Sequence, residues 1–84
     1  MAPEELLTVL RERPFQPFRI ALTDGRTFEV RHPEMVLAGR RSAVVGLPGA
    51  GETEPLYDRR ITVDLLHIVS MEPIQVPAKP NGQA

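Results

Sequence analysis

Apolar and polar positions alternate in two short runs between Phe18 and Arg31. Every second position from Phe18 to Leu22 is apolar, and the alternation resumes at Phe28 and Val30. Asp24-Gly25 stands between the two runs, and this dipeptide is typical of two-residue hairpin turns. The pattern predicts an antiparallel hairpin formed by Phe18–Thr23 and Arg26–Arg31.

The N-terminal residues follow a helical period instead. Leu6, Leu7 and Leu10 form one apolar stripe, and acidic residues occupy the first turn, where the helix dipole favours them. Pro14 cannot continue a helix. A short amphipathic helix is therefore predicted over residues 3–13.

The second half of the chain predicts further short strands. His32-Pro33 breaks or bends the second strand, because proline removes a ladder donor, and an apolar run resumes over Met35–Ala38. Ser42–Leu47 forms a third strand. A loop over 48–55 then leads to a strand at Leu56–Val63, with Tyr57, Arg59, Ile61 and Val63 on one face. Asp64 is suited to cap a single turn before a last strand at His67–Glu72.

Length and composition fit one small soluble domain. The 84 residues are 42% hydrophobic and 25% charged, with a formal net charge of −1 and no cysteine. The missing cysteines exclude disulfides, Cys-ligated zinc and thiol catalysis. We expect a domain over residues 1–73, a disordered tail over 74–84, no membrane span and a cytoplasmic location.

A helix followed by five short strands predicts a mainly β fold: an N-terminal helix and a five-stranded, strongly bent antiparallel small barrel. This layout, with the turn Leu22-Thr23-Asp24-Gly25-Arg26, resembles the Sm-like family, including Hfq-like proteins, and more broadly the SH3-like barrels. LTDGR, RHPEM and LLHI also resemble phrases in short bacterial proteins of unknown function. Sm-like proteins hold uridine with an asparagine, and no asparagine stands between Arg26 and Leu47. The resemblance therefore supports a similar fold better than it supports RNA binding. The predicted core contains Leu6, Phe18, Ile20, Leu22, Phe28, Val30, Val44, Ile61, Val63 and Ile68.

Arginine is the main candidate for a binding role. Nine of the ten basic residues are arginine, and residues 11–41 hold seven of them against four acidic residues. Arginine pairs with phosphate through two parallel hydrogen bonds. A patch for an RNA or DNA backbone is predicted from Arg19, Arg26, Arg31, Arg40, Arg41, Arg59 and Arg60. The simpler interpretation is a solvated face on which Glu29, Glu34 and Asp58 are cross-strand partners.

Metal and catalytic sites are weaker interpretations. His32, Glu34 and His67 are possible ligands, but their spacing does not indicate a metal site, and a structural role for both histidines is preferred. No nucleophile motif or phosphate-binding loop is present in the sequence. We therefore expect no metal, no cofactor and no catalytic residue.

Two kinds of binding module remain. The first self-associates through exposed strand edges near Leu56–Val63 and His67–Glu72 and binds nucleic acid. The second is an SH3-like module that takes an extended peptide or a partner's strand edge, using Phe15, Phe18 or Tyr57. A homo-oligomer is expected; a ring of about five to seven subunits would favour the first module, and a monomer or dimer the second.

Overall fold

The computed structural model describes residues 1–48 and 57–74 of the chain. Those residues form one α-helix, six strands and two short 3₁₀ helices. In chain order they are α1 (Pro3–Arg11), β1 (Phe18–Leu22), β2 (Thr27–Val30), η1 (Pro33–Met35), β3 (Val36–Ala38), β4 (Ser42–Leu47), β5 (Arg59–Asp64), η2 (Leu65–His67) and β6 (Ile68–Pro73). No helix in this part of the chain is long and apolar enough to cross a membrane.

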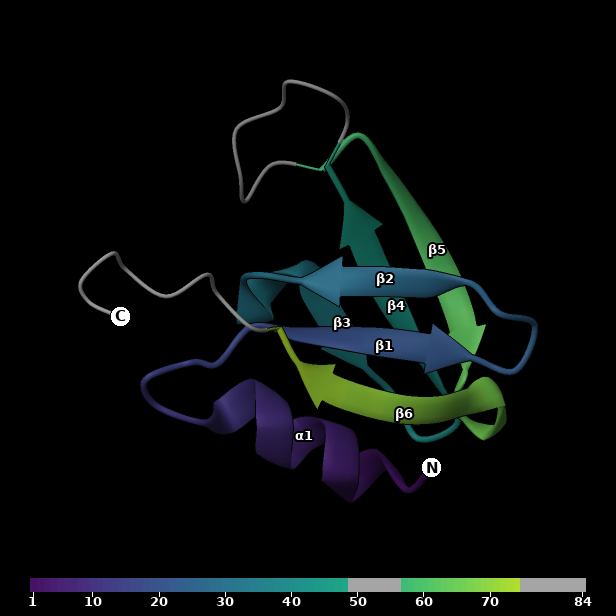
Figure 1. The fold of residues 1–84 in the computed structure, drawn as a ribbon, viewed down its shortest axis with the longest axis horizontal. Coiled ribbons are helices and arrows are strands. Elements are labelled where there is room, and N and C mark those ends of the chain that lie inside the picture. The colour runs from purple at the N-terminus through teal and green to yellow at the C-terminus, as the bar shows by residue number, and fades with distance from the viewer. Residues whose placement is uncertain (49–56, 75–84) are drawn as a thin grey trace.

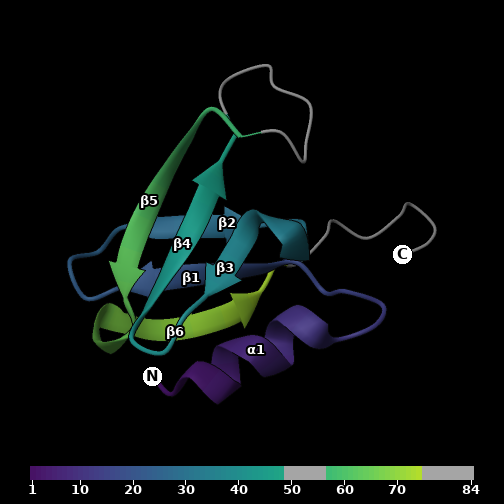
Figure 2. The same ribbon diagram turned by 180° about the vertical axis from the view of Figure 1, so that it is seen from behind.

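The six strands form two three-stranded antiparallel sheets, ordered β2–β1–β6 and β3–β4–β5 (Figures 1 and 2). Neither sheet closes into a barrel. The predicted five-stranded bent barrel is therefore wrong. The mainly β composition and the N-terminal helix, by contrast, are present.

Pro33 explains the sixth strand. The sequence left open whether His32-Pro33 breaks or bends the second strand, and the five-stranded barrel assumed a bend. The chain breaks there and forms η1, in which the Met35 amide donates to the His32 carbonyl at 3.1 Å. Proline has no N–H to donate to a ladder, so pairing stops there. β3 then begins at Val36 in the other sheet, and the one bent strand becomes two.

The predicted hairpin is confirmed. β1 and β2 pair with Phe18 opposite Val30 and Ile20 opposite Phe28. Gly25 adopts a φ of 92°, a left-handed conformation that glycine accepts without steric cost. The Asp24-Gly25 signal therefore located the turn, but the loop has three residues, 23–25, rather than the two predicted. Leu22 and Arg26 face each other at its ends, where the Leu22 amide donates to the Arg26 carbonyl at 2.9 Å.

α1 is the predicted N-terminal helix, although it ends at Arg11 rather than residue 13. Glu12 is already extended, with a ψ of 140°, and Pro14 disfavours a helical conformation of the residue before it. The helix packs against β3 and buries Leu6 completely and Leu10 almost completely. Burial of one leucine side chain contributes about 1.5–3 kcal/mol, so the stripe accounts for the docking of the helix.

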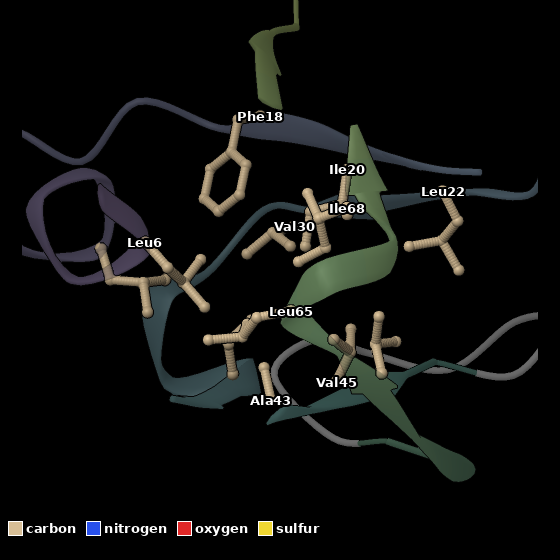
Figure 3. Close-up of a cluster of buried hydrophobic side chains, with 12 residues drawn as sticks. Leu6, Phe18, Ile20, Leu22, Val30, Ala43, Val45, Leu65 and Ile68 are labelled. Atoms are coloured by element: carbon tan, nitrogen blue, oxygen red, sulfur yellow. The ribbon is translucent and has the colours of Figure 1, made fainter. Parts of the chain in front are cut away.

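The core lies between the two sheets and α1. Figure 3 shows side chains from these three elements and from η2 pointing toward one another. Seven of the ten predicted core residues are buried: Leu6, Phe18, Ile20, Leu22, Val30, Val63 and Ile68. Phe28 and Ile61 are partly buried against this cluster.

Val44 was assigned to the core wrongly. In the β3–β4–β5 sheet it lies opposite Leu37 and Thr62, both exposed, while its neighbours Ala43 and Val45 are buried. Side chains alternate between the faces of a strand, so Val44 belongs to the outer face. The apolar run Ala43-Val44-Val45 has no polar residue that would indicate which side faces inward.

The fourth predicted strand also needs correction. β5 begins at Arg59, and Tyr57 precedes it instead of sharing a face with Ile61 and Val63. Tyr57 packs over Gly46, whose neighbour in the register is Arg60. Except for Pro48, the predicted loop 48–55 lies outside the described residues, as does Leu56.

Asp64 caps the turn as predicted: its carboxylate accepts a hydrogen bond of 2.9 Å from the Leu66 amide in η2. Of the predicted tail, residues 75–84 lie outside the described part. Ile74 is buried, and its amide donates to the Pro17 carbonyl at 3.0 Å.

Candidate functional site

Three of the seven candidate arginines carry ion pairs with acidic residues of the hairpin. Glu29 lies opposite Arg19 and accepts hydrogen bonds from it at 3.0 Å and from Arg31 at 2.9 Å. The Arg26 side chain donates to Asp24 at 2.8 Å. The simpler interpretation of the sequence made Glu29 a cross-strand partner of an arginine, and Glu29 has that role in the structure. These three guanidinium groups are therefore partly neutralised.

The hairpin ion pairs also influence the acids. Hydrogen bonds from Arg19, then Arg31, lower the pKa of Glu29 below its ordinary value. The pKa of Asp24 is lowered too, first by the hydrogen bond from the Arg26 backbone amide. Arg26 additionally lies 5.8 Å from the centre of the Phe28 ring. Its guanidinium thus interacts with a carboxylate and with an aromatic face of the same molecule.

The other four candidate arginines separate into two pairs. Arg59 and Arg60 begin β5, where Arg59 lies opposite Leu47. Arg40 and Arg41 lie in the turn before β4, close to the end of β5 that is paired with Ser42. Five residues of strand separate these ends, or about 17 Å. Within the described residues no ion pair involves any of the four.

Arg40 and Arg41 stand beside the hollow that is the strongest candidate site. It measures about 390 Å³ and is lined by Met1, Arg40, Arg41, Asp64, Leu65 and Leu66. The β3–β4 turn is held tight by a 2.7 Å hydrogen bond from the Gly39 amide to the Ser42 carbonyl. A second bond, from the Leu65 amide to the Arg41 carbonyl at 2.8 Å, joins the turn to η2. Two segments distant in sequence thereby form one surface.

The charge of this hollow is positive. Two guanidinium groups line it against one carboxylate, that of Asp64. That carboxylate accepts the Leu66 amide within its own turn instead of pairing with an arginine. Leu66 is 79% exposed and adds an apolar surface next to the two cations. The arrangement suits an anionic group with an apolar neighbour.

The histidines and Glu34 are not assembled into a metal site. His67 lies beside Thr23, with 3.3 Å between Nδ1 and the threonine hydroxyl oxygen, in a hollow of about 200 Å³ at the hairpin turn. Glu34 lines a different hollow over the β3–β4–β5 sheet. The described residues contain no group of three potential ligands placed to hold a metal ion.

A second surface was not anticipated from the sequence. The outer face of the β3–β4–β5 sheet, formed by Leu37, Val44, Gly46, Tyr57 and Thr62, surrounds a shallow hollow of about 110 Å³ that Met35, Glu34 and Arg60 also line. Leu37 is 71% exposed and Tyr57 56% exposed. The sequence would have predicted this apolar surface if Val44 had been assigned to the outer face, beside Leu37. The aromatics proposed for peptide binding are divided between the two sheets. Phe18 of β1 is buried and packs edge-on against Phe15, whereas Tyr57 lies exposed against Gly46 of β4.

Comparison of the chain with protein-family models, with curated proteins and with solved structures finds no match. The resemblance to the Sm-like family therefore stays a prediction.

Proposed function

We propose that the chain is a non-catalytic binding module that holds the phosphate backbone of a single-stranded nucleic acid at the Arg40–Arg41 turn. One observation carries this proposal. Arg40 and Arg41 flank a hollow of net positive charge without an ion pair among the described residues, whereas Arg19, Arg26 and Arg31 have acidic partners.

The chemistry of the site favours phosphate. Guanidinium groups pair with phosphate oxygens through two parallel hydrogen bonds, and the apolar Leu66 offers a surface for a base or sugar. With two cations, a single copy makes few phosphate contacts, so we expect weak binding that depends strongly on salt. Arg59 and Arg60, about 17 Å away along β5, are outside this site. A nucleic-acid partner also agrees with the expectation of a cytoplasmic protein.

The test is a titration of a fluorescently labelled oligouridine with the full chain, followed by anisotropy at several salt concentrations. We expect Arg40→Ala/Arg41→Ala to weaken binding about tenfold or more, and to reduce the slope of log affinity against log salt by about 1.4. The matched control is Arg26→Ala/Arg31→Ala, which removes the same charge from the hairpin. It should change the affinity less than about threefold, because both side chains already pair with acids.

Two results would overturn the proposal. One is equal weakening by both double variants, which would mean that only overall charge matters. The other is the absence of salt-dependent binding by the unmodified chain. A DNA oligonucleotide of the same length, measured in parallel, reports whether the ribose hydroxyl contributes.

A further inference from the structure

The outer face of the β3–β4–β5 sheet is apolar and open. Leu37, Val44 and Thr62 form one row across the three strands, and Tyr57 packs over Gly46 in the next row. In Figure 2 this sheet lies in front of β1 and β2, and no described helix or strand covers it. Single exposed apolar residues are common on proteins, but here Leu37, Val44 and Tyr57 line one hollow.

Two opposite charges flank this apolar surface. Glu34 precedes β3, and Arg60 lies on β5, so they stand at opposite edges of the sheet. Two strand spacings, roughly 10 Å, separate those edges, and the ion pairs found among the described residues do not include one between Glu34 and Arg60. Both residues nevertheless line the same hollow. The face therefore presents a negative edge, an apolar centre and a positive edge.

Such a face is complementary to itself. Arg60 is paired in register with Gly46, and a Cβ on Gly46 would lie 3.2 Å from Tyr57 Cβ and 3.3 Å from the Met35 methyl group. Glu34, next to Met35, and Arg60 thus stand at about the same height along β4. A two-fold axis parallel to β4 and lying between two stacked sheets exchanges the two edges while preserving that height. It brings Glu34 of each copy over Arg60 of the other, and the symmetry creates the pair twice.

We propose that the occupant of the outer face is a second copy of this chain, stacked sheet to sheet in a symmetric dimer. Leu37, Val44 and Tyr57 form the apolar centre of the interface, and two Glu34–Arg60 pairs form its rim. This differs from association through strand edges, because the edges of β3 and β5 stay unpaired. It is also independent of the nucleic-acid proposal, because Arg40 and Arg41 lie beyond the opposite end of β4.

The expected dimer is weak. Three strands and five residues give a sheet face of about 14 by 17 Å, which is small beside the roughly 800 Å² that each partner buries in a typical stable complex. A dissociation constant of roughly 10 µM to 1 mM is therefore expected. Sedimentation equilibrium of the full chain up to about 1 mM covers this range.

The decisive experiment reverses the rim charges. Glu34→Arg gives a face with two positive edges, and Arg60→Glu gives one with two negative edges. Each variant alone should dimerise at least about tenfold more weakly, because like charges then oppose each other twice. An equimolar mixture of the two should associate again, since every rim pair is then of opposite sign. Both residues are exposed, so folding should be unaffected, which circular dichroism would verify.

A second pair of variants tests the apolar centre. Leu37→Asp should weaken the dimer about thirtyfold or more, whereas Leu66→Asp, a matched control on η2, should leave it unchanged. The proposal is wrong if the unmodified chain stays monomeric at about 1 mM. It is also wrong if the mixture of charge-reversed variants fails to associate, or if Leu37→Asp and Leu66→Asp act alike.

Discussion

The backbone amide of Leu65 donates a 2.8 Å hydrogen bond to the carbonyl of Arg41. This contact joins the β3–β4 turn to η2 across 24 residues of sequence, and it does so through the backbone of both segments. The Arg41 side chain therefore takes no part in this hydrogen bond. A substitution there removes a charge from the hollow without removing the bond that shapes it.

Asp64 offers a test of the charge in this hollow. Asp64→Asn retains an oxygen that can accept the Leu66 amide but removes the only carboxylate lining the hollow. If the hollow holds phosphate, oligouridine should bind about two- to threefold more tightly to this variant at low salt. The control is Asp58→Asn, which removes an exposed acid at the other end of β5 and should have a smaller effect. Equal effects of the two variants would contradict a local site.

The same residue allows a separate prediction for stability. Asp64→Ala leaves the Leu66 amide without its acceptor in η2, and loss of a cap costs about 1 kcal/mol. Urea denaturation should show this loss for Asp64→Ala and less than half of it for Asp64→Asn. Identical stability of the alanine variant and the unmodified chain would mean that water replaces the cap without cost.

Gly39 should tolerate alanine worst among the glycines of the described residues. A Cβ at this position would lie 2.9 Å from the Ser42 carbonyl oxygen, a backbone atom held by the adjacent strand. We expect Gly39→Ala to destabilise the fold by about 1–3 kcal/mol. Gly25→Ala meets no atom within 4 Å, but its φ of 92° is strained for alanine, so a cost of about 1 kcal/mol is expected. Thermal denaturation of both variants would test the order.

The sequence predicted correctly the elements that depend on neighbouring residues alone, namely β1 and the position of the turn that follows it. The alternation of Phe18, Ile20 and Leu22 placed β1 and its buried face correctly, and Asp24-Gly25 located the turn. Val44 was misplaced because a continuous apolar run does not indicate which face is inward; its partners Leu37 and Thr62 decide this. The 3₁₀ helix η1 separates β2 from β3. The sequence could not show that β3 would then pair in the second sheet, because its partner β4 comes later in the chain.

Among the candidate site residues too, contacts within one hairpin could be predicted, whereas contacts between segments distant in sequence could not. A two-residue turn at Asp24-Gly25 would set Arg19 opposite Val30, so the exact register of the hairpin did not follow from the predicted turn. That Glu29 and Arg19 share the polar face of the hairpin was within reach of the sequence, because side chains alternate between the two faces of each strand. The meeting of Arg41 with Leu65 was not, since no sequence pattern relates these two segments. The sequence named all seven arginines equally. Only the fold shows that three of them have acidic partners, and that Arg40 and Arg41, of the remaining four, line one hollow together.

Leu6 and Leu7 provide a comparison for the docking of α1. Leu6 is completely buried, whereas the adjacent Leu7 is half-buried on the same helix. Leu6→Ala should cost about 2–5 kcal/mol, through lost burial and the cavity it leaves. Leu7→Ala, with the same change in helix propensity, should cost less than about half as much. Urea denaturation of both variants measures the difference, and equal losses would mean that the helix does not dock through Leu6.

Glu29 should make stability depend on pH in the acid range. Its pKa is lowered in the folded protein from an ordinary value of 4.5, because Arg19 and Arg31 donate hydrogen bonds to its ionised form. A carboxyl whose pKa is lower when folded stabilises the fold above its unfolded pKa, and this contribution disappears as the pH falls through the folded value.

The size of the Glu29 contribution is limited by solvent, because its side chain is 40% exposed, so we expect less than about 1 kcal/mol. Urea unfolding should be followed as the pH is lowered from neutral through and below 4.5. Glu29→Gln should be less stable than the unmodified chain at neutral pH, and the two should converge in acid. A constant difference across the whole range would show that the loss comes from packing or hydrogen bonding rather than from the charge of Glu29.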